Sequence, residues 1–434
     1  MDIDRRTFVA AGLTAASARG VLGASNTIRL GLIGCGNRGR YLTELAMKQP
    51  GVHFVAACDV WSQNREKARD LMGGSVALYG DFRRLIDNRK IDAVIVATPE
   101  HWHAIPAIQA CQAGKDVYVE KPLCHNVREG RRMVEAAREY NRIVQTGTQH
   151  RSAPHFPEFH ERVRAGEFGT IHSVRCFHYR NRVPSGIGHT PDEPPPSGMD
   201  WDMFCGPAPW VPFSRNRLNY WLQYYEFSGG SVTDMAVHYF DTVHEIMGVE
   251  FPVSVTATGG RFLVKDDGEV PDVLQIVYQY PNFTLTWDEN RTNGFGIGRH
   301  NQGVPYHQSK GTLDHPTGMI FHGSGATIVA DRLGYEIFSE AVHPTRLTGP
   351  VRRGAEDVAA LHLANFFECV RSRKRPKADV ETGHRATLVG HIGNIAYRTN
   401  RKLEWDPVHE SFPNAGPAVQ AMLSRTYRVP WRVA

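Results

Sequence analysis

The sequence predicts an α/β fold in two parts: a doubly wound parallel sheet, then an α/β domain with a large, mostly antiparallel open sheet. Two observations predict it. Up to residue 146, short apolar runs alternate with stretches of helical periodicity, as in parallel strands joined by crossover helices. From Thr170 onward, strand patterns are separated by long loops, which is typical of a mixed or antiparallel sheet. The expected domains are 27–150 and 151–434.

The first 24 residues carry features of an export signal. The segment 4–9 (DRRTFV) resembles the twin-arginine motif, small apolar residues follow, and 22–24 (LGA) would precede a cleavage point. We therefore expect residues 1–24 to be a twin-arginine signal peptide and the protein to be periplasmic or otherwise exported. The alternative is a cytosolic N-terminus with two chance arginines.

The next segment predicts a dinucleotide-binding loop. An apolar strand from Ile28 runs into a G-x-G-x-x-G pattern, whose residues are Gly34, Cys35, Gly36, Asn37, Arg38 and Gly39. The three glycines allow a tight turn, a close approach to pyrophosphate and close packing of the next helix. A second apolar strand, 53–58, ends at Asp59. A carboxylate there accepts hydrogen bonds from the ribose diol and repels a 2′-phosphate, which favours NAD over NADP.

The rest of the first domain continues the alternation. Helices are expected at 63–72, 81–88, 101–113 and 126–140, and strands at 91–97, 116–119 and 143–146. Ligands of such sheets bind at the carboxyl ends of the strands. We therefore expect Gly34, Asp59, Thr98 and Lys121 to surround one crevice.

The second part is expected to contain strands at 171–179, 253–263, 273–280, 284–287 and 326–330, and closing helices at 359–372 and 382–399. Two long loops are expected at 184–196 and 291–318. His300, His307 and His315 in the second loop could bind a metal, but their wide spacing and lack of acidic neighbours favour surface histidines. No metal is expected.

Composition excludes several classes of protein. The net charge of +5 is small for 434 residues and does not indicate a nucleic-acid partner, and the basic run 371–377 is expected to be a solvated helix end. The seven cysteines form no C-x-x-C motif and their number is odd, so neither a disulfide framework nor a zinc site is expected. No stretch is apolar enough to predict a membrane span.

Two places carry candidate chemistry. Lys121 lies between a strand end and a proline, where it could transfer a proton near the nicotinamide; the alternative is a loop lysine paired with Glu120. Asp234 and His238 are four residues apart, so on a helix they share one face and could converge on a substrate hydroxyl. The alternative is an ordinary helix N-terminus with a buried His238.

Taken together, G-x-G-x-x-G, E-K-P at 120–122 and G-G-x-x-x-D-x-x-x-H-x-x-D at 229–241 resemble the Gfo/Idh/MocA oxidoreductase family. The resemblance covers essentially the whole chain after the signal. The segments 98–104, 199–202 with 206–207, and 371–406 resemble its exported subgroup. The one departure noted is Met235-Ala236, where relatives often carry a Gly-rich or apolar pair.

The resemblance implies a Rossmann domain that holds NAD, a second α/β domain, and homo-oligomers (dimers or tetramers) built on the large sheet. It implies that Lys121 and His238 handle the proton, that Asp234 orients the substrate, and that the peptide before Pro122 is cis. The cofactor residues expected are Gly34, Cys35, Gly36, Asn37, Arg38, Gly39, Asp59, Thr98, Pro99, His101, His103, Glu120 and Lys121. Substrate contacts are expected from Tyr220, Tyr225, Trp201 and His238.

Three functions follow as hypotheses. The first is oxidation of a secondary ring hydroxyl of a sugar, glycoside or cyclitol by hydride transfer to tightly held NAD. The second is a redox-neutral NAD-dependent glycosidase, which oxidises transiently, eliminates a leaving group and returns the hydride; export favours it, because free NAD is scarce outside the cytoplasm. The third is a non-catalytic NAD(H)-dependent sensor.

Overall fold

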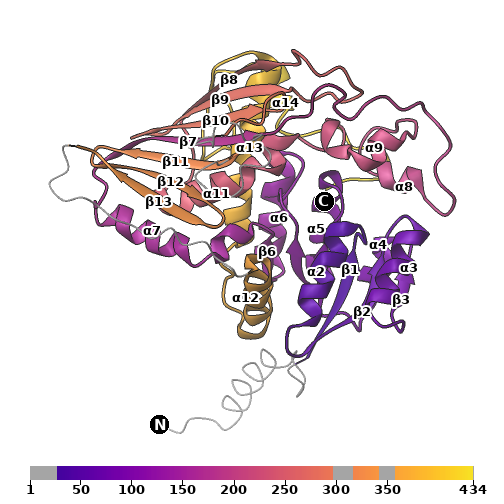
Figure 1. Cartoon of the computed structure of the whole chain (residues 1–434). Coiled ribbons are helices and arrows are strands. Elements are labelled where there is room, and N and C mark those ends of the chain that lie inside the picture. The colour runs from indigo at the N-terminus through magenta and orange to yellow at the C-terminus, as the bar shows by residue number, and fades with distance from the viewer. Residues whose placement is uncertain (1–26, 297–315, 342–356, 434) are drawn as a thin grey trace, which may run out of the picture.

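The computed structural model describes residues 27–296, 316–341 and 357–433 (Figure 1). The predicted signal peptide and the histidines His300, His307 and His315 lie outside the described residues, so export remains a prediction. Within the described ranges, no helix is long and apolar enough to span a membrane, and no group of three or more His, Cys, Asp or Glu side chains could hold a metal ion. The seven cysteines are buried free thiols.

The first sheet is parallel throughout, as predicted, with strand order β3-β2-β1-β4-β5-β6. Its strands are β1 (Ile28–Ile33), β2 (Val52–Cys58), β3 (Ala77–Tyr79), β4 (Ala93–Val96), β5 (Asp116–Val119) and β6 (Val144–Thr146). The sequence did not predict β3, because a three-residue edge strand has no detectable period. The order places the strand ends of β1 and β4 side by side, at the point where the winding reverses.

Helices join these strands. They are α2 (Asn37–Met47), α3 (Ser62–Leu71), α4 (Phe82–Ile86), η1 (Glu100–Trp102), α5 (Ala104–Gln112) and α6 (Val127–Glu139). The single helix expected at 101–113 is divided into a 3₁₀ turn, η1, and α5. The Asn126 side chain accepts a hydrogen bond from the Glu129 backbone N–H and so caps α6 at the predicted start.

The second sheet is mixed and mostly antiparallel, also as predicted, with order β13-β12-β11-β7-β10-β9-β8-β14. Its strands are β7 (Ile171–Tyr179), β8 (Ser254–Gly260), β9 (Val273–Gln279), β10 (Thr284–Asn290), β11 (Thr317–Gly323), β12 (Ala326–Asp331), β13 (Gly334–Ser339) and β14 (Leu403–Glu404). Only β7 and β10 pair in parallel.

Three of these strands were not predicted. β11 begins inside the segment expected to be a loop, and its four consecutive buried residues give no alternating pattern. β13 and β14 are an edge hairpin strand and a two-residue strand. The predicted strand 253–263 ends early, at Gly260.

Helices cover one face of the large sheet. α11 (Ala236–Met247) lies against the central strand β7, α13 (Val380–Thr399) lies against β8 and β9, and α7 (His155–Arg164) lies against β13 (Figure 1). The shorter elements are η2 (Gln149–Ser152), α8 (Trp201–Cys205), α9 (Arg215–Asn219), η3 (Trp221–Gln223), α10 (Ser231–Asp234) and α14 (Pro417–Ala421). The main core lies between this sheet and these helices, with Trp287 and Phe240 at its centre.

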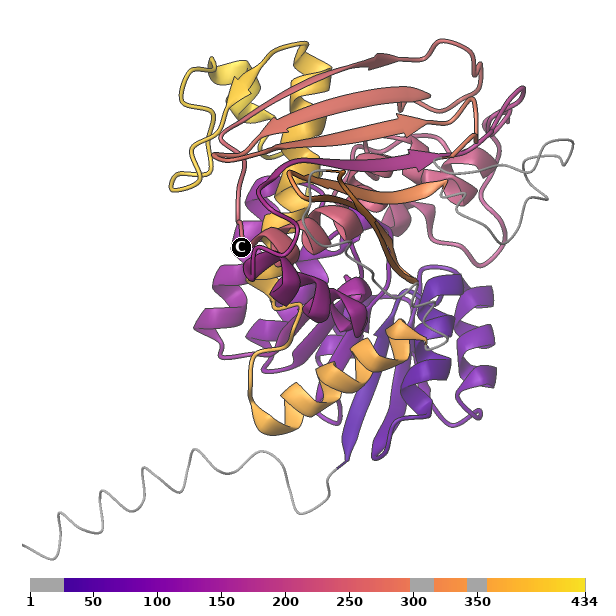
Figure 2. The same ribbon diagram turned by 60° about the vertical axis from the view of Figure 1, so that its left-hand side comes forward.

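The chain returns twice from the second part to the first. Helix α12 (Val358–Ser372) buries Leu363 and Phe366 in the cluster formed by β1 and α2, and Figure 2 shows it lying along the N-terminal half. Near the C-terminus, the Trp431 ring packs against the Trp102 ring, with 4.7 Å between the ring centroids. The predicted boundary after residue 150 therefore does not separate the two packing units completely.

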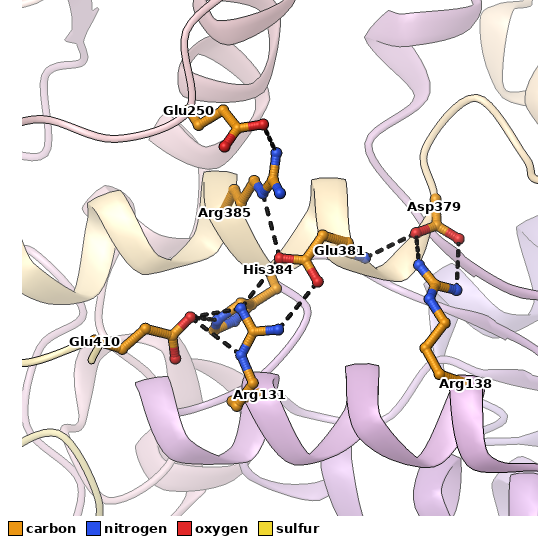
Figure 3. Close-up of polar contacts among 8 residues, drawn as sticks. All are labelled: Arg131, Arg138, Glu250, Asp379, Glu381, His384, Arg385 and Glu410. Atoms are coloured by element: carbon orange, nitrogen blue, oxygen red, sulfur yellow. Dashed lines mark hydrogen bonds and ion pairs between the residues drawn. The ribbon is translucent and has the colours of Figure 1, made fainter. Parts of the chain in front are cut away.

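Ion pairs connect α6 of the first part to α13 of the second (Figure 3). Arg131 donates to Glu381 at 3.0 Å and to Glu410 at 2.6 Å, and His384 hydrogen-bonds to Glu410 at 2.8 Å. Burial acts to raise the pKa of Glu410, but the hydrogen bonds from His384 and Arg131 outweigh it and lower this pKa to about 2. This group therefore stabilises the fold fully above its unfolded pKa, and the stabilisation is lost as pH falls toward 2.

We expect Arg131→Met to lower the free energy of unfolding by about 2 kcal/mol at pH 7, because the carboxylates of Glu381 and Glu410 each lose one of their two hydrogen-bonded partners. Urea unfolding measures the change. Arg132→Met, the next residue, removes only an exposed pair with Glu135 and should cost less than about 0.5 kcal/mol. Equal losses in the two variants would contradict a specific role of Arg131 in this contact.

Candidate active site

One cavity of about 750 Å³ lies at the carboxyl ends of the first sheet's strands. Gly34, Asp59, Thr98 and Lys121 all line it, as the strand-end argument predicted, and Asp234 reaches it from the second part of the chain. Of the predicted cofactor residues, Gly36, Asn37, Arg38, Pro99 and Glu120 also line it. We call it the cofactor cavity.

The glycines of the loop meet different demands. Gly34 has φ +93°, in the left-handed region, and a Cβ on Gly39 would lie 2.0 Å from the Gly34 carbonyl oxygen. A Cβ on Gly36 would meet no protein atom within 4 Å. Gly36 is the N-cap of α2, and Asn37 and Arg38 of the first turn of this helix line the cavity. The N-terminus of a helix offers free N–H groups to an anion. This cradle fits a dinucleotide pyrophosphate.

Asp59 is positioned by the loop itself. Its carboxylate accepts hydrogen bonds from the backbone N–H groups of Cys35 at 2.7 Å and Trp61 at 2.8 Å. Burial raises the pKa of Asp59, and these two hydrogen bonds act in the opposite direction. The Cys35 side chain is buried, so its part of the predicted loop contributes a backbone group. The carboxylate lines the cavity where the motif places the ribose diol.

Glu120 and Lys121 have separate partners. The Arg38 guanidinium pairs with the Glu120 carboxylate at 2.7 Å. The Lys121 ammonium pairs instead with the Asp234 carboxylate and donates to the Asp234 carbonyl oxygen at 3.2 Å. The alternative of a side-chain pair between Lys121 and Glu120 is therefore wrong. The Lys121–Pro122 peptide is cis, as the resemblance implied.

The helix that carries Asp234 and His238 is interrupted between them. α10 ends at Asp234, Met235 lies between the helices, and α11 begins at Ala236. Asp234 reaches the cavity, whereas His238 is 5% exposed and does not line it. Its ring stacks on His150 at 4.7 Å, and its pKa is lowered well below the ordinary value by burial and then by His150. A proton-handling role for His238 remains a prediction.

His101 and His103 also lie just behind the cavity wall. His103 hydrogen-bonds to the carbonyls of Pro122 at 2.7 Å and Thr98 at 2.9 Å, and so joins the ends of β5 and β4. His101 hydrogen-bonds to the Phe204 carbonyl at 2.8 Å. Both rings are buried, which lowers their pKa, that of His101 to about 3. They position the residues that line the cavity.

The predicted substrate aromatics lie elsewhere. Trp201 is buried in a cluster with Phe204, and its indole donates to the Val211 carbonyl at 2.8 Å. Tyr220 is 42% exposed, and Tyr225 lines a separate cavity with Arg398. None of the three lines the cofactor cavity, and their substrate roles remain predictions.

The structure adds residues that the sequence did not indicate. Those of the second part that line the cavity are Met203, Phe204, Leu218, Asn219 and Trp221, together with Met199 from the segment 199–202 that the resemblance had included. Glu100 is fully buried and accepts from the Ser228 hydroxyl at 2.8 Å and the Thr233 hydroxyl at 3.3 Å, which anchors the turn before Asp234. Burial first, and then the Asp234 charge, raise its pKa to about 8. The one sequence signal that could have pointed to Glu100 is its position within segment 98–104, which resembles the family's exported subgroup.

Two family comparisons match the two parts of the chain. Residues 28–148 match the NAD-binding Rossmann fold of an oxidoreductase family, and residues 169–284 and 356–433 match the C-terminal α/β domain of the same family. The chain belongs to the Gfo/Idh/MocA oxidoreductase family. The predicted family and the NAD-binding domain are thereby confirmed.

Relatives in this family include polyol dehydrogenases. Myo-inositol 2-dehydrogenase of Thermotoga maritima is 24% identical over 397 residues, which are 88% of this chain and 99% of that protein. Scyllo-inositol 2-dehydrogenase (NAD(+)) of Bacillus subtilis is 25% identical over 384 residues, which are 86% of this chain and 94% of that protein. The fold is also similar to that of the WlbA dehydrogenase of Bordetella pertussis, solved in complex with NADH and UDP-GlcNAcA. The TM-score is 0.65 and the sequence identity is 19%, and the match covers 88% of this chain and 99% of that protein.

Proposed function

We propose that this member of the Gfo/Idh/MocA family oxidises a secondary hydroxyl on the ring of a sugar or cyclitol, with NAD as the hydride acceptor. The observation that carries the proposal is the pair formed by Lys121 and Asp234 in the cavity that Gly36 and Asp59 also line. The polyol substrates in the names of the two inositol dehydrogenases support the substrate class.

Each residue has a task that follows from its place. The pyrophosphate would be held by Gly34, Gly36 and the N-terminus of α2. The ribose diol would donate hydrogen bonds to the Asp59 carboxylate. Bound NAD would supply the hydride-accepting carbon. Asp234 accepts a hydrogen bond from a substrate hydroxyl. Lys121 acts as the base in its neutral amine form: it takes up the proton of the reacting hydroxyl as the hydride leaves and the carbonyl forms, and so becomes an ammonium group. The direct contact between the Lys121 and Asp234 side chains would bring both groups to the same substrate oxygen.

The test uses the purified protein without added cofactor, mixed with inositols, free sugars and glycosides. We expect nicotinamide absorbance at 340 nm to rise toward one equivalent, with a keto product, and to continue when NAD is added. Cleaved glycoside over many turnovers without lasting reduction would contradict the proposal and favour the redox-neutral glycosidase. NAD binding without turnover of any polyol would favour the sensor.

A further inference from the structure

A second, smaller pocket adjoins the cofactor cavity, and Asp234 lines both. It has a volume of about 110 Å³, and three of its lining residues are the arginines Arg180, Arg182 and Arg291. We call it the arginine pocket. A group bound there lies beside the carboxylate that the proposed function assigns to the substrate.

The backbone brings these arginines together. Arg180 directly follows β7 and Arg291 directly follows β10, and these adjacent strands are paired in parallel up to Tyr179 and Asn290. The Arg180 N–H donates to the Asn290 carbonyl at 2.8 Å, and the Arg182 N–H donates to the Arg291 carbonyl at 2.8 Å. The three side chains therefore start from one rigid strand end rather than from a free loop.

The positive charge of this pocket is not balanced locally. In the described parts of the chain, none of the ion pairs involves Arg180, Arg182 or Arg291. The charge of Asp234 is offset by Lys121. Two carboxyl groups act on the charge of Arg291, the buried Glu289 and Asp266, and Asp266 is itself paired with Arg261. Among the described residues, no ion pair offsets the charges of the two exposed arginines, Arg180 and Arg182.

The other pocket residues add no charge. His178 is buried, which lowers its pKa to about 4, so its ring is neutral at pH 7. Gln223 accepts a hydrogen bond from the Arg291 side chain, which fixes the orientation of that guanidinium. A volume of about 110 Å³ corresponds to a group of a few heavy atoms, since a water molecule occupies about 30 Å³ in the liquid.

We infer that the substrate carries an anionic substituent, a carboxylate, phosphate or sulfate, which the arginine pocket binds while the ring hydroxyl lies at Lys121 and Asp234. The inference rests on the proposed function and narrows its substrate class to acidic sugars or cyclitols. Arginine suits this task because its planar guanidinium binds such oxyanions through two parallel hydrogen bonds.

The experiment compares acidic and neutral substrates that share a ring. NAD-dependent oxidation is measured with D-glucose, D-glucuronate, D-glucose 6-phosphate and D-glucose 6-sulfate, and with myo-inositol and its monophosphate. We expect kcat/KM to be about 100-fold higher for an acidic compound than for its neutral counterpart, because two charged hydrogen bonds are added. The anion that gives the largest ratio identifies the substituent.

The decisive variant is the double substitution Arg180→Gln/Arg182→Gln, since both side chains are exposed and their loss should leave the fold intact. We expect KM for the preferred acid to rise about 100-fold, with kcat/KM for the neutral counterpart and the affinity for NADH unchanged. Arg401→Gln/Lys402→Gln, which removes two exposed positive charges after α13, is the control for the change in net charge and should leave KM unchanged. Thermal unfolding verifies that each variant is folded.

The outcomes separate this inference from the proposed function. Oxidation of neutral polyols with no preference for acids, or an acid preference that survives the double substitution, would overturn the inference and leave the proposed dehydrogenase intact. NADH binding without oxidation of any neutral or acidic compound would overturn both. A shift in the unfolding temperature of the NADH-bound protein by D-glucuronate, lost in the double variant, would support the inference without relying on turnover.

Discussion

Lys121→Met is expected to lower kcat for polyol oxidation by about 10²–10⁴, the contribution that a positioned acid–base group makes. Methionine keeps an unbranched side chain that is one atom shorter, and it has no group that can accept the hydroxyl proton. Lys121 is also the partner of the Asp234 side chain, so the substitution frees a carboxylate that lines the cavity. Stopped-flow measurement of a single turnover at saturating NAD isolates this chemical step.

The matched control is Lys67→Met, which removes a lysine that lines the same cavity but lies on α3 and is not paired with Asp234. It should change the affinity for NAD more than kcat. The NADH affinity of Lys121→Met, measured by fluorescence, should remain within about threefold of the parent value, because the loop around Gly36 is untouched. An unaltered single-turnover rate in Lys121→Met would rule out the proposed role of this residue.

Gly36→Val and Gly39→Ala should fail in different ways. A side chain on Gly36 points into open cavity space, so we expect Gly36→Val to remain folded and to bind NAD about 100-fold more weakly, or about 2.7 kcal/mol. A Cβ on Gly39 lies 2.0 Å from the Gly34 carbonyl oxygen, a backbone atom that cannot rotate away. Gly39→Ala must therefore move α2 away from β1 and should lower the unfolding temperature.

Calorimetric titration with NAD and thermal unfolding distinguish the two effects. The loss of the glycine N-cap in Gly36→Val should cost only about 1 kcal/mol of stability. Normal NAD affinity in Gly36→Val would mean that the pyrophosphate does not approach this residue. Normal stability of Gly39→Ala would mean that α2 does not pack against the loop as described.

Much of the first domain was predictable from the sequence because its signals are local. The loop needs a glycine at Gly34, where φ is +93°, and a residue without a side chain at Gly39. The buried strand β4 requires a continuous apolar run, and β1 is apolar and buried except at its exposed residue Arg29. Asp59 follows β2 directly, so its place in the crevice follows from the parallel topology. These requirements act within one strand, turn and helix.

Short strands and helix interruptions were less predictable. β3 and β14 contain three and two residues, too few for a period to show. The break at Met235 depends on what packs around α10, including the buried Glu100, which lies 133 residues from Thr233. The spacing of Asp234 and His238 predicted one shared helix face, whereas the helix is interrupted between them and, of the two, Asp234 alone lines the cavity.

The sequence by itself determined the two-part α/β architecture, the NAD-binding loop with its acidic partner, and the candidates Lys121 and Asp234. Only the tertiary structure decided that these two form an ion pair across 113 residues of chain, and that Arg180 and Arg291 end adjacent strands beside them. The physical reason is the distance along the chain over which each interaction acts. Neighbouring residues impose the backbone conformation and the repeat of buried positions. Strand order and helix packing bring distant side chains together, and they depend on the whole core.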